Sequence, residues 1–231
     1  MGYRLLLVFA GAYLFAITVI HILPELYMNS GGLELIGVFV LAGFFLQQVL
    51  EQFTSGVEHG HLHQDDHHHH DHDHAGLPHH NFQPGSALVL LFALCIHAFL
   101  EGSMLAQPLG EEPVYDVNAI LLGIALHRAP AAFALMTLLA FQLSSRRKAL
   151  PHLFVFSIAA PAGLLLSTYL TEQELLSSTG LMYLYALVCG NFLHISTTIV
   201  FESSPQHRFN AKKLAVAILG ALVAVGVEHI I

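Results

Sequence analysis

Long apolar stretches, separated by short polar segments, dominate the hydrophobic pattern of this chain. Each stretch is close to the roughly 20 apolar residues that a helix needs to cross the hydrocarbon core of a bilayer. Apolar residues are continuous within each stretch, whereas the strands of a membrane β-barrel alternate in short segments. The pattern therefore predicts an all-α fold, a polytopic membrane helix bundle of about seven transmembrane helices. We expect one domain over residues 1–231, with spans at about 5–26, 34–52, 86–105, 118–142, 152–170, 181–201 and 213–231.

The composition agrees with a chain that lies in lipid. Hydrophobic residues make up 55% of the 231 residues and charged residues only 10%, whereas soluble domains are about 25% charged. So few charges cannot cover a water-facing surface. The formal net charge of −8 argues against a nucleic-acid partner, because such proteins use basic patches to replace counterions. Cys95 and Cys189 lie in separate apolar stretches, so we expect neither a disulfide framework nor a CxxC zinc site.

Basic residues outside the predicted spans all fall on one side of the membrane if successive spans alternate in direction. The opposite side carries acidic residues and no lysine or arginine. The positive-inside rule then predicts a multi-pass protein of the cell membrane, with a cytoplasmic N-terminus and an external C-terminus. The basic residues are Arg4, Arg146, Arg147, Lys148, Arg208, Lys212 and Lys213, and the acidic ones are Glu34, Glu111, Glu112, Asp116, Glu172 and Glu174.

Residues 55–85 contain eleven of the eighteen histidines, interleaved with aspartate. A segment of this composition cannot bury a core, so we predict a disordered His-rich loop on the cytoplasmic side. Because imidazole and carboxylate groups suit zinc, nickel, copper and iron, we expect the loop to capture metal loosely. A low-complexity spacer is the alternative. The histidines expected to capture metal are His59, His61, His63, His67, His68, His69, His70, His72 and His74.

Ionisable residues inside the predicted spans point to function, since each costs about 2.5–3.5 kcal/mol at the centre of a membrane helix. His97 and Glu101 are four residues apart in the third span, so both side chains leave one face of the helix. An imidazole nitrogen and a carboxylate oxygen can then converge on one cation at about 2.0–2.2 Å, as zinc prefers. The alternative is a His–Glu pair that only neutralises itself between packed helices.

The fourth span holds His127 and Arg128 close to Pro130. Pro130 frees the carbonyl of Leu126, so we expect a bend beside His127 and a station for a substrate. The alternative is a histidine bonded to a neighbouring carbonyl. The guanidinium of Arg128 does not deprotonate and needs an anion or a wet cavity, so we expect it beside the metal pocket. A snorkelling or merely salt-bridged arginine is the alternative, and the candidate partners are Glu25, Glu101 and Glu202.

Two further polar groups are predicted to line a metal pathway. His21 and Glu25 close the first span, four residues apart and with Pro24 between them. His194 belongs to a polar stripe in the sixth span, which lines a pathway or hydrogen-bonds helices together. The stripe consists of Asn191, His194, Ser196, Thr197 and Thr198.

The order of these motifs resembles that of the ZIP family of divalent metal transporters. The family pattern has a His-hydrophobic-Pro-Glu span end, a cytoplasmic His-rich loop, a span with His-Asn-x-x-Asp/Glu-Gly and a span with His-Glu-x-Pro-His-Glu. The resemblance covers nearly the whole chain, and the order of the motifs is more specific than any one of them. The counterparts here are His21-Ile22-Leu23-Pro24-Glu25, the loop 59–80, His97-Ala98-Phe99-Leu100-Glu101-Gly102 and His127-Arg128-Ala129-Pro130-Ala131-Ala132.

The departures from the family pattern imply a reduced metal site. The family has eight spans, and this chain is expected to begin at the second of them. Alanine at 98, 131 and 132 and arginine at 128 stand where the family has ligands for two bridged metals. What the resemblance leaves is a mononuclear set of His97, Glu101 and His127, and an open fourth position suits a metal that must leave again. Arg128 is expected to replace the charge of the second metal.

The resemblance implies uptake of a divalent metal into the cytoplasm, with zinc as the first expectation and Fe²⁺, Mn²⁺ and Ni²⁺ compatible with the same ligands. It also suggests a homodimer. We expect no organic cofactor and no enzyme activity, since an intramembrane metalloprotease would need an H-E-x-x-H motif, which the chain lacks. No G-x-x-x-x-G-K-[ST] motif for ATP is present, so we expect the ion gradient and the membrane potential to supply the energy. Three alternatives stay open: a metal exporter of the cation-diffusion type, a haem-binding membrane cytochrome, and a degenerate, non-transporting metal-binding sensor.

Overall fold

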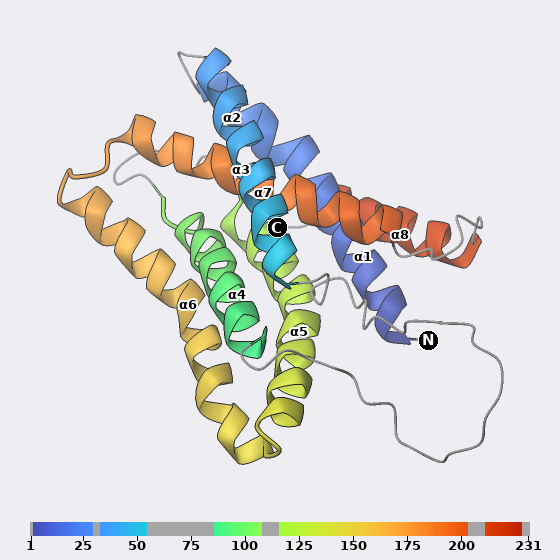
Figure 1. Ribbon diagram of the computed structural model, residues 1–231. Coiled ribbons are helices and arrows are strands. Elements are labelled where there is room, and N and C mark those ends of the chain that lie inside the picture. Colours follow the sequence, from blue (N-terminus) through green and yellow to red (C-terminus); the bar gives the residue numbers. More distant parts are fainter. Residues whose placement is uncertain (1, 30–32, 55–85, 108–115, 203–210, 228–231) are drawn as a thin grey trace.

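The computed structural model describes residues 2–29, 33–54, 86–107, 116–202 and 211–227. Every regular element in these residues is helical, and each predicted span contains one continuous helical segment (Figure 1). The predicted all-α membrane bundle is thereby confirmed. Among the described residues, five segments are long and apolar enough to cross a membrane. The elements are α1 (Gly2–Ile17), η1 (Thr18–Ile22), α2 (Leu23–Asn29), α3 (Leu33–Thr54), α4 (Ser86–Ser103), α5 (Val117–Gln142), α6 (Arg146–Glu172), α7 (Ser178–Glu202) and α8 (Ala211–Val227).

The start of α6 differs from the prediction. The helix begins at Arg146 after Ser145 as its N-cap, so Arg146, Arg147 and Lys148 form its first turn and are not a loop. The continuous apolar run starts only after Pro151, and the basic residues before it carry no apolar signal, so the predicted span began too late. The backbone instead stays helical through Pro151 and continues to Glu172.

The first helical segment changes its winding just before Pro24. One turn of π-helix, η1, separates α1 from α2, and the amide of Leu23 bonds to the carbonyl of Thr18 five residues earlier. Proline has no amide hydrogen to offer the preceding turn, and a single wide turn is one way for a helix to accommodate this. His21 lies in that turn, and Glu25 follows in the first turn of α2.

In two helix pairs, each helix places a glycine against the backbone of the other at a distance that leaves no room for a Cβ atom. A Cβ atom at Gly102 of α4 would collide with the carbonyl of Ala160, and one at Gly163 of α6 with the carbonyl of Phe99. Gly43 of α3 and Gly190 of α7 make the same reciprocal contact. Small residues allow membrane helices to pack at this distance. The contact with α6 fixes the turn of α4 that carries the central polar side chains.

The helices form two groups that meet at the centre of the molecule. Helix α4 packs on α5 and α6, while α7 packs on α1 and α3, and α8 covers α1 (Figure 1). A large apolar cluster around Tyr13, Tyr185 and Phe192 joins α1, α5 and α7. A second cluster, which includes Leu94 and Phe156, fills the space between α4, α5 and α6. Polar side chains placed between the two groups are therefore shielded from lipid.

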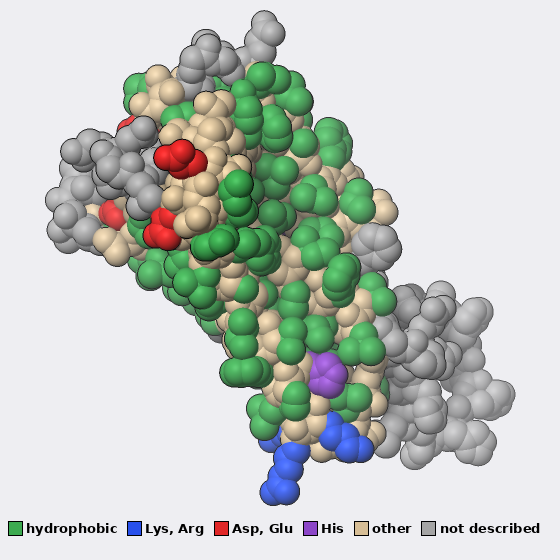
Figure 2. All heavy atoms as spheres, turned by 90° about the vertical axis from the view of Figure 1, so that its left-hand side faces the viewer, with side chains coloured by type: hydrophobic (Ala, Val, Ile, Leu, Met, Phe, Trp, Pro, Cys, Tyr) green, Lys and Arg blue, Asp and Glu red, His purple; other side chains and the backbone are tan. Residues whose placement is uncertain are grey.

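The outer surface has the charge distribution of a membrane protein. On the face over α6, apolar side chains cover the middle, while acidic and basic groups gather at opposite ends (Figure 2). Phe154 is 65% exposed and Leu165 is 69% exposed, which suits contact with lipid. The basic end is the start of α6 at Arg146, and the acidic end is its last residue, Glu172. The chain is a multi-pass membrane protein.

Candidate metal centre

The central polar group is built first on one helix, α4. His97 and Glu101 are one turn apart, and the Nε2 atom of His97 lies 2.8 Å from an Oε1 oxygen of Glu101. The carboxylate is fully buried and the imidazole is 5% exposed. Their shared face follows from the spacing of four residues, so the sequence correctly predicted this contact.

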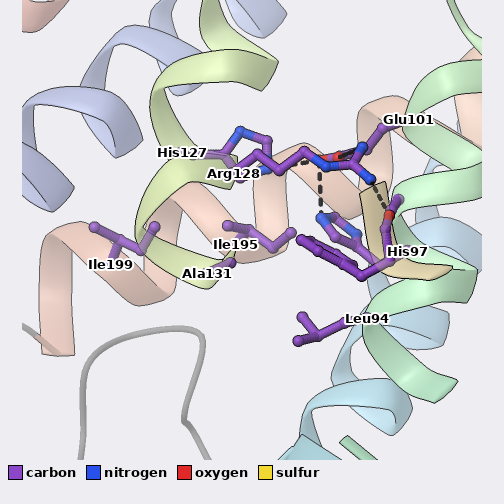
Figure 3. Close-up of a pocket in the computed structure, with 10 residues that line it drawn as sticks. Leu94, His97, Glu101, His127, Arg128, Ala131, Ile195 and Ile199 are labelled. Atoms are coloured by element: carbon purple, nitrogen blue, oxygen red, sulfur yellow. Dashed lines mark hydrogen bonds and ion pairs between the residues drawn. The ribbon is translucent and has the colours of Figure 1, made fainter. Parts of the chain in front are cut away.

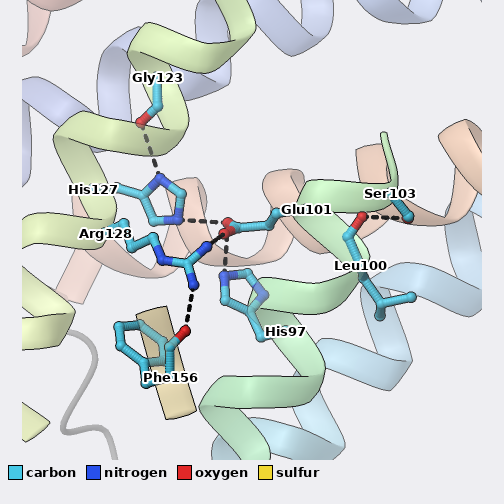
Figure 4. Close-up of polar contacts among 8 residues, drawn as sticks. All are labelled: His97, Leu100, Glu101, Ser103, Gly123, His127, Arg128 and Phe156. Atoms are coloured by element: carbon cyan, nitrogen blue, oxygen red, sulfur yellow. Dashed lines mark hydrogen bonds and ion pairs between the residues drawn. The ribbon is translucent and has the colours of Figure 1, made fainter. Parts of the chain in front are cut away.

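Helix α5 contributes His127 to the same carboxylate. The Nε2 atom of His127 lies 2.6 Å from Glu101 Oε1, while its Nδ1 atom contacts the carbonyl oxygen of Gly123 at 3.0 Å (Figure 4). A carbonyl only accepts hydrogen bonds, so Nδ1 carries a proton and donates it there. Hydrogen bonding at one ring nitrogen sets which nitrogen is left for a metal. The arrangement therefore leaves Nε2, on the side of Glu101, as the nitrogen available to a cation.

His97, Glu101 and His127 bring one ligand atom each to within 4.8 Å of the others. In the described part of the chain, this is the one group of three or more potential metal ligands that converges so closely. The rings of His97 and His127 meet at 69°, with centroids 5.9 Å apart, and Phe192 of α7 packs against His127. Two imidazoles and a carboxylate make a donor set suited to zinc and its neighbours.

Arg128 lies beside this group and does not snorkel to the surface. Its NH1 nitrogen is 4.0 Å from Glu101 Oε2, and its NH2 nitrogen donates to the carbonyl of Phe156 at 2.7 Å. The guanidinium carbon also sits 4.6 Å from the centroid of the Phe156 ring. Glu101, one of the expected partners, is thus in contact with Arg128, because α4, α5 and α6 meet at this level. One fixed positive charge adjoins the buried carboxylate.

A small cavity opens against the three polar side chains. It is lined by polar groups from α4 and α5 and by apolar residues from α6 and α7 (Figure 3). Ile195 and Ile199 of α7 are both buried and form its apolar wall. Ala131, at a position where the family pattern has a histidine, also lines it. The cavity leaves room for a small group beside the three polar side chains.

His21 and Glu25 lie in a second cavity, away from the first. Asp116, the N-cap of α5, lines the same cavity and accepts a hydrogen bond from the amide of Asn118. The sequence pointed to Asp116 only as one of several external acids. Its place immediately before a predicted span was the signal that it could face the helices.

His194 forms an ion pair that the sequence did not predict. Its Nε2 atom lies 2.6 Å from Oε2 of Glu51, which is in the last turn of α3. The hydroxyls of Thr197 and Thr198 instead bond to carbonyls of their own helix, so neither of these bonds joins two helices. A carboxylate inside a predicted span was the available signal for Glu51. The nine histidines expected to capture metal, in segment 55–85, lie outside the described residues.

Comparison with known proteins decides the family. A family model described as ZIP Zinc transporter matches residues 56–228. The chain belongs to the ZIP family. Zinc transporter ZIP9 of Xenopus tropicalis is 29% identical over 172 residues, which are 71% of this chain and 51% of that protein. Zinc transporter ZIP9 of Micropogonias undulatus is 28% identical over 172 residues, 71% of this chain and 50% of that protein.

A third ZIP relative, Zinc transporter ZIP9 of Macaca fascicularis, is 30% identical over 159 residues, covering 59% of this chain and 66% of that protein. The chain spans about half the length of the Xenopus and Micropogonias relatives that it matches. No solved structure matches it. The match of the ZIP family model includes both helices of the central group, so His97, Glu101 and His127 belong to the part of the chain that is like the family.

Proposed function

We propose that this ZIP protein carries a divalent metal ion, zinc first among them, across the cell membrane into the cytoplasm. The observation that supports this most is the convergence of His97, Glu101 and His127 inside a membrane helix bundle. Buried charge is costly in lipid and is found where it serves transport or binding. The three groups come from two helices, so their separation depends on how those helices lie.

The proposed site holds one ion and must open slightly to receive it. In a tetrahedral zinc site with bonds of about 2.0–2.1 Å, neighbouring ligand atoms are about 3.4 Å apart. The two imidazole nitrogens now lie 2.8 and 2.6 Å from Glu101 Oε1, so each must move outward by roughly 0.6–0.8 Å. Small side-chain rotations are sufficient for this. The cavity beside the triad leaves a fourth position for water.

Arg128 supports a mononuclear site. It holds a fixed positive charge 4.0 Å from the second oxygen of Glu101, where a bridged second cation would have to bind. The guanidinium is anchored to Phe156 by a hydrogen bond and by its ring, so it cannot easily withdraw. We propose that this charge replaces that of a second metal.

The distribution of charge supports inward transport. The acidic cavity of His21, Glu25 and Asp116 lies at the opposite end of α5 from the basic turn Arg146–Lys148. If the basic end faces the cytoplasm, the acidic cavity is the external entrance, and it would concentrate cations there. An inside-negative membrane potential then favours inward movement by about 2.3 kcal/mol per charge for each 100 mV. The His-rich loop would receive the ion on the cytoplasmic side, and we expect the protein to work as a homodimer with one transmembrane domain per chain.

Zinc flux into vesicles that contain the purified full-length protein tests this function. Wild type should transport zinc, while His97→Ala and Glu101→Gln should lower the rate at least tenfold. His152→Ala is the matched control, because His152 is a partly exposed residue of α6 whose ring nitrogen contacts the carbonyl of Lys148 in its own helix. Equal flux in wild type and His97→Ala would contradict the mechanism. Saturable zinc binding without flux would favour the metal-sensor alternative.

A further inference from the structure

The basic first turn of α6 lies at one end of a surface that faces lipid. Arg146, Arg147 and Lys148 are all exposed, and Figure 2 shows basic groups at this end of the face over α6. None of the three is in an ion pair with a carboxylate of the described residues. The positive-inside rule accounts for basic residues at this end of a span but requires no particular partner for them.

An exposed apolar row begins at Arg146. Residues four apart lie on the same face of a helix, so each turn adds one member to the row. The next three members are Leu150, Phe154 and Ile158, which are 53%, 65% and 44% exposed. The row covers about 18 Å of helix rise, close to the roughly 15 Å that one leaflet contributes to the hydrocarbon core. An acyl chain can therefore lie along this row while its headgroup is at the arginine.

Arg147 begins a second, shorter row of the same kind. Pro151 and Val155 follow it at intervals of four residues, and both are exposed. The two rows together form one broad exposed face of α6, with two guanidinium groups at its end. Charge and apolar surface thus adjoin each other in the order in which a phospholipid presents its headgroup and its chains.

The chemistry of this face matches a phospholipid with a net negative charge. Guanidinium groups bind phosphate oxygens through parallel hydrogen bonds, and two adjacent arginines favour an anionic headgroup. Phosphatidylcholine carries a cationic group of its own, which weakens such a contact. A water-soluble phosphate has no chain to bury on the apolar row. If the basic end of α6 faces the cytoplasm, as proposed above, it also meets the leaflet in which anionic lipids are concentrated.

The opposite face of the same helix reaches the metal centre. Phe156 is buried, and its carbonyl accepts the hydrogen bond from Arg128. Further along α6, Gly163 packs against the backbone of α4 at Phe99. A ligand that holds the exposed face of α6 therefore acts on the helix that positions Arg128.

We propose that the exposed face of α6 binds an anionic phospholipid, whose phosphate contacts Arg146 and Arg147 and whose acyl chain lies along the apolar row. By holding α6, the lipid keeps Arg128 beside Glu101 and raises the rate of zinc transport. The effect on the rate rests on the proposed function, whereas the binding of the lipid does not.

Lipid titration of the purified full-length protein in a non-ionic detergent, without zinc, tests the binding. The probes are phosphatidylglycerol and phosphatidylcholine with the same acyl chains, and the rise in melting temperature gives the affinity. Phosphatidylglycerol should bind the wild type at least tenfold more tightly than phosphatidylcholine. The double variant Arg146→Gln, Arg147→Gln should bind phosphatidylglycerol at least tenfold more weakly, because each basic residue near an anionic surface contributes about fivefold. Equal affinity of the wild type for the two lipids would overturn the site.

A second double variant, Lys212→Gln, Lys213→Gln, is the matched control for charge. It also removes two basic residues from the start of a helix, α8, but the next members of their rows, Val216 and Ala217, are only partly exposed. This variant should bind phosphatidylglycerol within twofold of the wild type. A loss as large as that of the arginine variant would show attraction by overall charge and overturn a site on α6.

Inorganic phosphate separates a lipid site from a phosphate site. It should leave the melting temperature unchanged at the concentration at which phosphatidylglycerol saturates, since it lacks an acyl chain. An equal rise with inorganic phosphate would overturn the lipid as the ligand. The exposed positions of Arg146 and Arg147 predict that the arginine variant melts like the wild type without added lipid, which is the reference for its titration.

Zinc flux into phosphatidylcholine vesicles, with and without added phosphatidylglycerol, tests the effect on transport. Wild type should move zinc several-fold faster with phosphatidylglycerol, and the arginine variant should not respond. An anionic membrane surface attracts zinc equally in both cases, so only the difference between the two proteins counts. The same acceleration in both would overturn the effect on transport and leave the binding intact. Absence of wild-type flux in every lipid would contradict the proposed function, while the titration in detergent still decides the lipid site.

Discussion

Replacing Arg128 by glutamate should allow the central site to hold two metal ions. A second divalent ion 4–5 Å from the guanidinium, the range set by the 4.0 Å between Arg128 and Glu101, would be repelled by roughly 7–8 kcal/mol at an effective dielectric constant of 20. Arg128→Glu turns this repulsion into attraction of similar size and adds a carboxylate ligand. The loss of the hydrogen bond to Phe156 should cost about 1–3 kcal/mol of stability, so a lower melting temperature is expected as well.

The measurement is the cobalt content per chain together with electron paramagnetic resonance, in a protein whose eleven histidines of segment 55–85 are replaced by asparagine to remove binding there. Two ions in one site lie about 3.5–4 Å apart and couple magnetically, which distinguishes them from ions bound at separate places. Arg128→Lys keeps the charge and should keep the wild-type stoichiometry, whereas Arg128→Met removes the charge without adding a ligand. An unchanged, uncoupled stoichiometry in folded Arg128→Glu protein would refute the idea that this charge excludes a second metal.

Three other changes test the centre, the packing and the entrance. Loss of an outer-shell partner lowers metal affinity by about 10–100-fold, and Glu101→Gln, which removes a proposed ligand, should lower zinc affinity by more. Competition with a zinc indicator measures the affinity, and binding within threefold of wild type would exclude Glu101 as a ligand. Gly102→Ala should lower stability by about 1–3 kcal/mol or more, because the new methyl collides with the backbone at Ala160. Gly226→Ala meets no atom of the described residues within 4 Å and should melt like wild type. Equal melting of the two alanine variants would contradict the close α4–α6 contact. Glu25→Gln should raise the zinc concentration for half-maximal flux several-fold at unchanged maximal rate, and a lower maximal rate alone would argue against an entrance role.

Contacts within one helix were predictable from the sequence. The length of the apolar runs predicted the helices, because a bilayer sets one thickness that every span must match. The spacing of four residues predicted that His97 and Glu101 would touch, since the helical repeat fixes that geometry wherever the helix lies. The start of α6 was missed by six residues, as proline and basic residues at a helix start carry no apolar signal.

Contacts between helices were decided by the tertiary structure. From the sequence alone, Arg128 had three possible acidic partners, and the meeting of α4, α5 and α6 brings it to Glu101. The approach of His127 to the same carboxylate was expected from the family resemblance but depends on the same packing. The partnership of Glu51 with His194, 143 residues apart, was not foreseen at all. Such pairs depend on the crossing and depth of two helices, which are set by side-chain packing and glycine contacts over their whole length, whereas the repeat of a single helix fixes only its own faces.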